Sequence, residues 1–355
     1  MAIRINQIKD RFKETSLPII YCNQVIAHDG IIFDGRSFCF DGTVKLIGKA
    51  FEPDCQIVEF KNNKLYPAKI YDHALSPQEE IYRAMTLGVR DYVRNNGFAQ
   101  VVLGLSGGID SAMVAAIAVD ALGADNVLAI MLPSKFTSSS SINDACEVAV
   151  RLKIKLITIP INNILGSFIN DFDGQVPLDE TSITYQNLQS RIRGTILMAK
   201  ANSSNSLLLT TGNKSEYATG YATIYGDMNG AFNPIKDIYK TELYEIAKYK
   251  NSLQNIFPDN ILTKAPTAEL AANQKDTDSL PPYEILDKIL ESYLEGGQNK
   301  AELSQQFDPK LVERVIRLIH NSEFKRRQAA PGVKVSSKNF EKDRRFPITN
   351  AYRDN

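Results

Sequence analysis

Residues 104 to 111, which read GLSGGIDS, have the types and spacing best suited to chemistry. An apolar run over residues 101–105 precedes them and an alanine-rich apolar segment follows, which predicts a buried strand, a turn and a helix. Glycines let the backbone approach a ligand, and the free N–H groups and the dipole at the start of a helix attract an anion. We therefore expect a site for the phosphates of a nucleotide. The residues of this expected loop are Gly104, Leu105, Ser106, Gly107, Gly108, Ile109, Asp110 and Ser111.

Asp110 does not suit a bare phosphate site, because its carboxylate would repel the anion. A divalent cation between the carboxylate and the phosphates resolves this conflict. A second stretch, LLTTGNKSE over residues 208–216, predicts a strand that ends near Gly212 and a carboxylate, Glu216, within one helical turn. Asp110 and Glu216 can then converge on one Mg²⁺ from neighbouring strand ends. The alternative is that Glu216 is a solvated carboxylate, favoured by the helix dipole.

Two other interpretations of the loop stay open. Residues 104–108 also satisfy G-x-S-x-G, the motif of a serine-hydrolase nucleophile elbow. That motif needs an acid and then a histidine downstream, and the one histidine after Ser106 is His320, in a helix-like charged stretch. The hydrolase interpretation is therefore poor, and an ordinary strand-to-helix turn also fits. No G-x-x-x-x-G-K-S/T pattern is present, which excludes a Walker-type loop.

Segments further along the chain add candidates. Residues 220–230 contain three glycines and Asp227, which suits a loop that closes over a ligand. Residues 234–241 are expected to open another helix, and Lys240 in it either reaches a phosphate or is a surface lysine of the first turn. Residues 273–282, polar and ended by two prolines, predict a mobile loop near the site or a plain surface connection. Basic runs within residues 323–346 predict a tail folded onto an anionic ligand or another subunit, or else a solvated face.

Strand-like runs alternate with helical patterns over most of the chain. This alternation predicts an α/β fold with a doubly wound parallel sheet, whose ligands lie beyond the carboxyl ends of the strands. Before that, a short helix and several short strands predict a thin α+β unit. We therefore divide the chain into residues 1–67 and 68–355. The expected strands are 101–105, 127–132, 156–161 and 207–211, and the expected helices include 76–95, 142–152, 181–201 and 283–294.

The composition excludes some classes of protein. Among 355 residues, 41 basic side chains balance 41 acidic ones, which gives no case for nucleic-acid binding. Neither a signal peptide nor a run of about 18 apolar residues is visible, so we expect a cytoplasmic protein that does not span a membrane. The cysteines show no C-x-x-C spacing, and we expect Cys22, Cys39 and Cys55 to be small core residues.

These motifs together resemble the synthetase domain of the glutamine-dependent NAD⁺ synthetases. The loop motif alone is shared by many pyrophosphate-loop ATPases, including GMP synthetase and transfer-RNA modifying enzymes, but the other stretches separate this family from them. The resemblance implies an adenine nucleotide alpha hydrolase-like fold of the pyrophosphate-loop ATPase type. It covers about residues 75–352 and rests on LSGGIDS, YQNLQSRIRG, TTGNKSE, YGDMNG with PIKDIYKTEL, KAPTAEL and EFKRRQAAPGVKVSSKNFEKDRRFPITN.

The resemblance also implies a reaction. The nicotinate carboxylate of deamido-NAD⁺ attacks the α-phosphate of ATP and pyrophosphate leaves, after which ammonia converts the acyl-adenylate into NAD⁺ and AMP. Such catalysis depends on positioning and on charge stabilisation, with ATP and Mg²⁺ as cofactors. Family members dimerise through this domain, which implies a homodimer or a larger homo-oligomer.

The site residues implied by the resemblance fall into four groups. ATP would be contacted by the loop of residues 104–111 and by Thr211, and Mg²⁺ would be held by Asp110 and Glu216. The catalytic residues at the reacting centre would be Asp227 and Lys240. Deamido-NAD⁺ would be contacted by Asn187, Glu216 and Lys325.

The N-terminal part departs from this family. Full-length relatives have a nitrilase-like glutaminase domain with a Glu-Lys-Cys triad, and residues 16–60 resemble only the last part of it. The resemblance therefore implies that residues 1–67 are a truncated remnant, in which Cys22 cannot be the nucleophile. We expect that this chain does not hydrolyse glutamine by itself, and that ammonia arrives free or from a separate glutaminase chain.

Two further hypotheses belong to other classes. A different adenylating enzyme could use the same loop, for example a transfer-RNA modifier, although the neutral net charge and the lack of cysteine pairs count against it. An inactive or partner-dependent subunit of a split glutamine-dependent NAD⁺ synthetase is the other alternative. The intact set of motifs counts against decay of the synthetase part.

Overall fold

A four-stranded parallel sheet forms the centre of the computed structural model, which describes residues 1–67, 75–172 and 179–349. Its strands are β8 (Val101–Gly104), β9 (Val127–Met131), β10 (Lys155–Thr158) and β11 (Leu207–Leu209). Their spatial order is β10-β9-β8-β11, and every pair is parallel. The chain therefore reverses its direction of winding between β8 and β11, and such a switch point opens a crevice at the carboxyl ends of the two strands.

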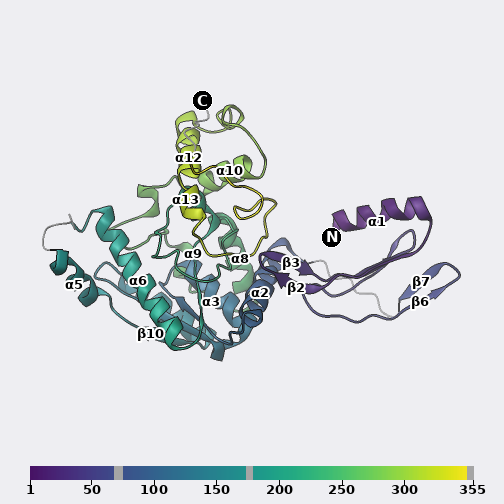
Figure 1. Cartoon of the computed structure of the whole chain (residues 1–355), viewed down its shortest axis with the longest axis horizontal. Helices are drawn as coiled ribbons and strands as arrows, with labels where there is room; N and C mark the ends of the chain where they lie inside the picture. Colours follow the sequence, from purple (N-terminus) through teal and green to yellow (C-terminus); the bar gives the residue numbers. More distant parts are fainter. Residues whose placement is uncertain (68–74, 173–178, 350–355) are drawn as a thin grey trace.

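Helices cover both faces of this sheet, which confirms the predicted doubly wound α/β fold (Figure 1). Val101 and Leu103 pack on one side, and Val102 between them packs on the other, as the period of two in a strand requires. The first face is covered by α2 (Pro77–Asn95), α3 (Ile109–Leu122), α4 (Ser139–Leu152) and α8 (Lys240–Leu253), and the second by α5 (Asn162–Phe172) and α6 (Ile183–Ser203).

Local sequence explains where these helices begin. The side chain of Ser76 accepts a hydrogen bond from the N–H of Glu79 at 3.1 Å, and Pro77 is the first helical residue of α2. Helix α3 is apolar on all sides and almost completely buried, because it lies between the sheet and α2. The start of α3 is thereby fixed directly after the loop of residues 104–108.

A second group of helices packs beside the sheet through its own apolar cluster. The C-terminal segment then folds back, and the N–H of Asn233 bonds to the carbonyl of Pro331 at 2.8 Å. Arg326 is buried and donates to the carbonyls of Tyr217, Ala218 and Ile319, so this part of the basic run is neither solvated nor free for a ligand. The elements of this part are α7 (Lys214–Thr219), α9 (Asp259–Thr263), η2 (Asp276–Asp278), α10 (Tyr283–Leu294), α11 (Lys300–Leu303), α12 (Pro309–Asn321) and α13 (Glu323–Arg326), and η1 (Ala124–Asn126) precedes β9.

The N-terminal segment is an α+β unit that projects from the main body (Figure 1). It consists of α1 (Ala2–Thr15), the antiparallel sheet β1 (Ile19–Tyr21), β4 (Phe38–Phe40) and β5 (Val44–Ile47), and the hairpins β2 (Val25–His28) with β3 (Ile31–Asp34) and β6 (Val58–Lys61) with β7 (Lys64–Pro67).

The β2–β3 hairpin joins this unit to the main body. The N–H of Ala27 donates to the carboxylate of Asp91 on α2 at 2.8 Å. Cys39 is buried as predicted, but Cys22 and Cys55 are exposed. The prediction that all three cysteines are core residues is therefore wrong for two of them, because this thin unit has little interior. None of the described helices combines the length and the apolar character needed to cross a membrane.

Candidate active site

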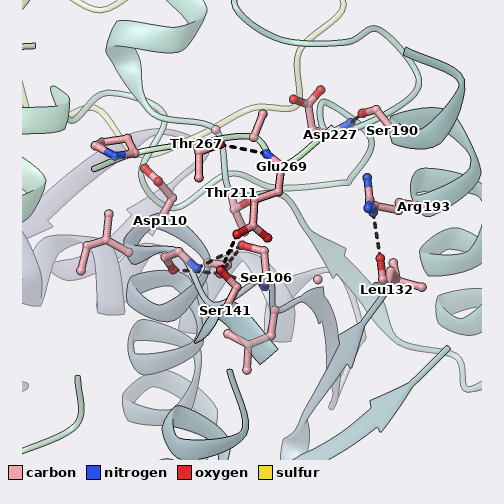
Figure 2. Close-up of a pocket in the computed structure, with 18 of the residues that line it drawn as sticks. Ser106, Asp110, Leu132, Ser141, Ser190, Arg193, Thr211, Asp227, Thr267 and Glu269 are labelled. Atoms are coloured by element: carbon pink, nitrogen blue, oxygen red, sulfur yellow. Dashed lines mark hydrogen bonds between the residues drawn. The ribbon is translucent and has the colours of Figure 1, made fainter. Parts of the chain in front are cut away.

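A cavity of about 280 Å³ lies at the carboxyl ends of β8 and β11, at the switch point of the sheet (Figure 2). Its walls include the loop after β8, the segment after β11 and residues 264–270, which are far apart in sequence. All of the predicted loop residues except Gly107 line it, and so do Thr211, Glu216, Asp227 and Lys240. Figure 2 shows Ser106 and Asp110 on one side and Arg193 and Asp227 on the other.

The loop has a fixed shape. Gly107 has φ +82°, and a Cβ at this position would lie 2.1 Å from the carbonyl oxygen of Ser141, so only glycine fits. The hydroxyl of Ser111 accepts from the N–H of Ser106 at 3.2 Å and donates to the carbonyl of Gly108 at 3.0 Å. The start of α3 therefore faces the cavity, as an anion site requires.

Asp110 and Glu216 are brought together by Asn213 and Lys240. The side-chain amide of Asn213 donates to Asp110 at 2.8 Å, and its N–H donates to the carboxylate of Glu216 at 3.1 Å. Lys240 forms an ion pair with Asp110 and is only 3% exposed. The alternative that Lys240 is a surface lysine is therefore wrong.

The charges of Asp110, Glu216 and Lys240, together with burial, shift the pKa values of Glu216 and Lys240. Burial and the nearby charge of Asp110 hold the pKa of Glu216 well above its usual value, although Lys240 acts in the opposite direction. Burial alone would lower the pKa of Lys240, but Asp110 and Glu216 outweigh burial and raise it. Glu216 is therefore no freely solvated carboxylate, and Lys240 keeps its positive charge at neutral pH.

The cluster also fits the magnesium ion that its carboxylates suggest. Two carboxylates that share a single lysine favour a divalent cation, and Mg²⁺ commonly uses one or two carboxylates together with substrate phosphates. Within the described residues, acidic, histidine and cysteine side chains form no group of three or more that could hold a metal ion alone. Asp110 and Glu216 thus fit a cation that is shared with a phosphate ligand.

Asp227 is on the opposite wall. Its carboxylate accepts from the N–H of Thr223 at 2.6 Å, and its own N–H donates to the hydroxyl of Ser190 at 3.0 Å. The side chain is exposed to the cavity, although the surrounding chain raises its pKa to about 6 through burial. Asp227 is thus ionised for the most part at neutral pH and can accept a proton.

Asn187 and Lys325 do not line this cavity. Asn187 accepts a hydrogen bond from the hydroxyl of Thr223 at 2.8 Å. The ammonium group of Lys325 donates to the carbonyls of Gly220 at 2.7 Å and Ala222 at 2.8 Å. Both residues contact residues 220–223 of the loop that contains Asp227, so they flank this loop without lining the cavity.

Three lining residues were missed as individual site residues. Arg193 donates from Nε to the carbonyl of Leu132 at 2.9 Å, and within the described chain its other nitrogens have no hydrogen-bond partner. Burial lowers its pKa to about 10, so it remains charged at neutral pH. Glu269 accepts from the hydroxyls of Ser138 and Ser141, both at 2.8 Å.

Asp276 is the third missed residue, and it belongs to the polar segment of residues 273–282. The motifs YQNLQSRIRG and KAPTAEL already contain Arg193 and Glu269, whereas the signal for Asp276 was only the expectation that residues 273–282 form a loop near the site. The position of Asp276 in the cavity wall excludes a plain surface connection for that part of the segment.

The hydrolase interpretation is wrong. The hydroxyl of Ser106 lies 3.1 Å from that of Ser111. His320 lies on α12, where its Nε2 is 2.9 Å from the hydroxyl of Tyr293. A nucleophile elbow requires the histidine to activate the serine, and here the two side chains have different partners.

Comparison with known proteins identifies the family. The model described as NAD synthase matches residues 81–329. The chain is 44% identical over 363 residues to the glutamine-dependent NAD(+) synthetase of Acinetobacter baylyi, and the match covers 99% of this chain and 66% of the relative. The chain thus spans about two thirds of the length of this curated relative.

Two solved structures are also similar. The glutamine-dependent NAD⁺ synthetase of Acinetobacter baumannii, solved with ADP, has a TM-score of 0.71 and 41% identity over 100% of this chain and 66% of its own. The NH₃-dependent NAD synthetase of Campylobacter jejuni has a TM-score of 0.58 and 32% identity over 71% of this chain and 96% of its own.

The comparisons correct the prediction of a truncated N-terminal remnant. The match to the Acinetobacter baylyi relative covers 99% of this chain, so it includes the N-terminal α+β unit. That prediction is wrong: it took residues 16–60 as matching only the last part of a glutaminase domain, whereas the relative aligns with nearly the whole of this chain.

The family model matches well over half of the residues, and the relatives exceed 40% identity over nearly the whole chain. The chain therefore belongs to the NAD synthase family.

Proposed function

We propose that this chain catalyses the ATP-dependent amidation of deamido-NAD⁺ to NAD⁺ through an acyl-adenylate, with release of AMP and pyrophosphate. The observation that carries the proposal is the cavity at the switch point of the sheet. There, a glycine loop at the start of a helix, two interacting carboxylates, a buried lysine and a carboxylate with a pKa near 6 line one space. Glutamine-dependent and NH₃-dependent NAD synthetases share this family, which supports the assignment.

The first step would use the loop side of the cavity. The nicotinate carboxylate oxygen attacks the α-phosphorus of ATP, the bond to the bridging oxygen breaks, and pyrophosphate leaves. The loop N–H groups would bind phosphate oxygens, Thr211 would contact ATP, and Lys240 would stabilise the charge that develops on the leaving group. Arg193 would offer its free nitrogens to an anionic oxygen from the opposite wall.

Asp110 and Glu216 would hold Mg²⁺ in this step. When bound, this ion neutralises phosphate charge and polarises the phosphoryl group. The chain's own part is to keep both carboxylates in place through Asn213, whose amide and N–H contact them.

The second step would use the opposite wall. Ammonia attacks the carbonyl carbon of the acyl-adenylate, the carbon–oxygen bond to AMP breaks, and the nitrogen loses a proton. Asp227 would accept that proton, because its carboxylate is open to the cavity and ionised above pH about 6. We propose ammonia as the nitrogen donor at this site, as in the NH₃-dependent relative.

The remaining assignments concern regions around the cavity. We propose that Asn187 and Lys325, together with Glu216, bind deamido-NAD⁺, and that the chain acts as a homodimer or larger homo-oligomer. Asn187 and Lys325 flank the Asp227 loop, so a dinucleotide that extends past this loop would reach them. We also propose that residues 68–355 form the ligase unit.

The test is NAD⁺ formation by the purified chain with deamido-NAD⁺, ATP and Mg²⁺, with ammonium or glutamine as the nitrogen source. We expect activity with ammonium and stoichiometric AMP. Activity with glutamine would show a nitrogen route within this chain, or within a chain that copurifies with it. Absence of activity with both donors, while ATP still binds, would contradict the ligase assignment and favour a partner-dependent subunit.

A further inference from the structure

Asp276 has an unsatisfied carboxylate oxygen inside the cavity wall. The residue lies in the η2 turn and is only 5% exposed. Its Oδ2 accepts a hydrogen bond from the hydroxyl of Tyr283 at 2.9 Å. Its Oδ1 is buried and has no partner at hydrogen-bonding distance within the described chain, although the hydroxyl of Tyr221 in the same cavity wall is close enough to act on this carboxylate. Leaving a buried polar atom without a partner destabilises the fold, so a ligand that donates a hydrogen bond to Oδ1 would be favoured here.

The charges of the side chains around Asp276 favour a positively charged ligand. Asp110, Glu216 and Asp276 line the same cavity, and Lys240 is the buried cation that they share. The ammonium group of Lys240 forms the ion pair with Asp110 and lies 5.6 Å from the ring centre of Tyr283, whose hydroxyl donates to Asp276. Three carboxylates and one ammonium group have a net charge of −2 when all are ionised.

We propose that Asp276 is a third carboxylate of the cation site, and that it binds the hydration shell of a divalent cation held by Asp110 and Glu216. This inference rests on the proposed function for the identity of the other ligands, but not on turnover. Mg²⁺ keeps several of its waters in protein sites, and a water bound to the cation is a strong donor for Oδ1. An outer position also agrees with the lack of a preformed three-carboxylate group among the described residues.

The test is direct binding of Mn²⁺, a paramagnetic substitute for Mg²⁺, followed by its electron spin resonance signal. The titration is run on the full chain with α,β-methylene-ATP, which cannot be cleaved between the α- and β-phosphates. We expect Asp276→Asn to weaken Mn²⁺ binding about 10-fold to 100-fold, as for other outer-shell partners of metals. The matched control is Asp278→Asn, because Asp278 is in the same turn but is exposed.

Stability measurements separate this role from a structural one. Without metal, Asp276→Asn removes an unsatisfied buried charge, so we expect the Tm to stay the same or to rise. A Tm that falls while Mn²⁺ affinity stays unchanged would overturn the inference and assign Asp276 to the fold. Tyr283→Phe offers a second variant with an intact carboxylate, and we expect it to weaken Mn²⁺ binding by a smaller factor.

Ammonium is the other cation that Oδ1 could bind. A raised KM for ammonium in Asp276→Asn, with unchanged Mn²⁺ affinity, would also overturn the inference. Failure of the proposed function gives a different pattern, because a chain that makes no NAD⁺ can still show the loss of Mn²⁺ affinity in Asp276→Asn.

Discussion

Lys214 and Lys240 are two buried lysines with opposite surroundings. Each is the first residue of a helix, α7 and α8 respectively, and each follows a chain segment from the carboxyl edge of the sheet. The ammonium group of Lys214 lies 2.8 Å from Glu295, 3.0 Å from Asp237 and 2.7 Å from the hydroxyl of Ser336. Lys240 has one ion pair, with Asp110, and faces the cavity.

The pKa values of the carboxylates around Lys214 and Lys240 are shifted in opposite directions. Burial would raise the pKa of Glu295, but Lys214 and the hydroxyl of Ser337 lower it below its usual value. In the other cluster the pKa of Glu216 is raised, because one lysine does not balance its carboxylates. We infer that a cluster whose charges are satisfied by the protein stabilises the fold, whereas an unsatisfied cluster is ready for a ligand.

The largest expected effect is on stability, in Lys214→Met. This change leaves Asp237 and Glu295 buried without their cation, so we expect a loss of about 3–5 kcal/mol in the free energy of unfolding. Guanidinium titration followed by circular dichroism measures it. Lys248→Met is the control, because Lys248 is on α8 but is exposed and paired with exposed Glu245. If the free energy of unfolding falls no more in Lys214→Met than in Lys248→Met, the Lys214 cluster does not stabilise the fold as inferred.

Lys240→Met should instead affect the reaction. We expect kcat for NAD⁺ formation to fall about 10²-fold to 10³-fold, the usual effect of removing one group that stabilises transition-state charge. The free energy of unfolding should change much less than in Lys214→Met, because Asp110 keeps its Asn213 hydrogen bond and opens onto the cavity. Full kcat in Lys240→Met would contradict its place at the reacting centre.

Asp227 should produce a pH effect of intermediate size. Its pKa is raised from 3.8 to about 6, so the carboxylate loses its charge below that pH. If it accepts the ammonia proton, kcat at a fixed concentration of free ammonia should fall to about one fifth from pH 6 to pH 5, as the ionised fraction of the carboxylate does. The measurement compares wild type with Asp227→Asn, which should lack this bend near pH 6.

Asp227 should affect stability in the opposite direction: low pH lowers kcat through this residue but raises the stability of the fold. The folded state binds the Asp227 proton more tightly than the unfolded state, so this group stabilises the fold at low pH. That contribution is lost as the pH rises from about 4 to about 6. Asp227→Asn should remove this pH dependence of the free energy of unfolding. An unchanged pH dependence in the variant would show that it comes from another group.

Local patterns in the sequence predicted one of the two lysine clusters only. Glycine spacing and strand ends placed Asp110 and Glu216 near one site, because the carboxyl ends of parallel strands meet at one edge, and the family resemblance added Lys240. Lys214 occupies an equivalent position in the chain, but its partners Glu295 and Ser336 are 81 and 122 residues away. Such pairing depends on how the C-terminal segment packs, and no local period encodes it.

Two other features depended on tertiary contacts in the same way. The segment around Asp276 is polar and rich in turn-forming residues, which is typical of a surface loop, yet Tyr283 and the cavity bury that carboxylate. No strand was expected at β2 or β7, each of which has only four residues. Strand β2 is stabilised by its partner β3 and by Asp91 of α2.

The smallest expected effect distinguishes the centre of the Lys214 cluster from its edge. The hydroxyl of Ser336 contacts Lys214 and Asp237, whereas the hydroxyl of exposed Ser337 contacts only Glu295, at 2.7 Å. Hydrogen bonds to charged groups contribute about 1.5–3 kcal/mol when buried, so we expect Ser336→Ala to lower the free energy of unfolding by about that amount and Ser337→Ala by less. Both variants should bind ATP as wild type does, because neither serine lines the cavity. Equal losses of unfolding free energy in Ser336→Ala and Ser337→Ala would mean that apolar contacts hold the C-terminal segment. The hydroxyl of Ser336 would then not be needed to stabilise the charge of Lys214.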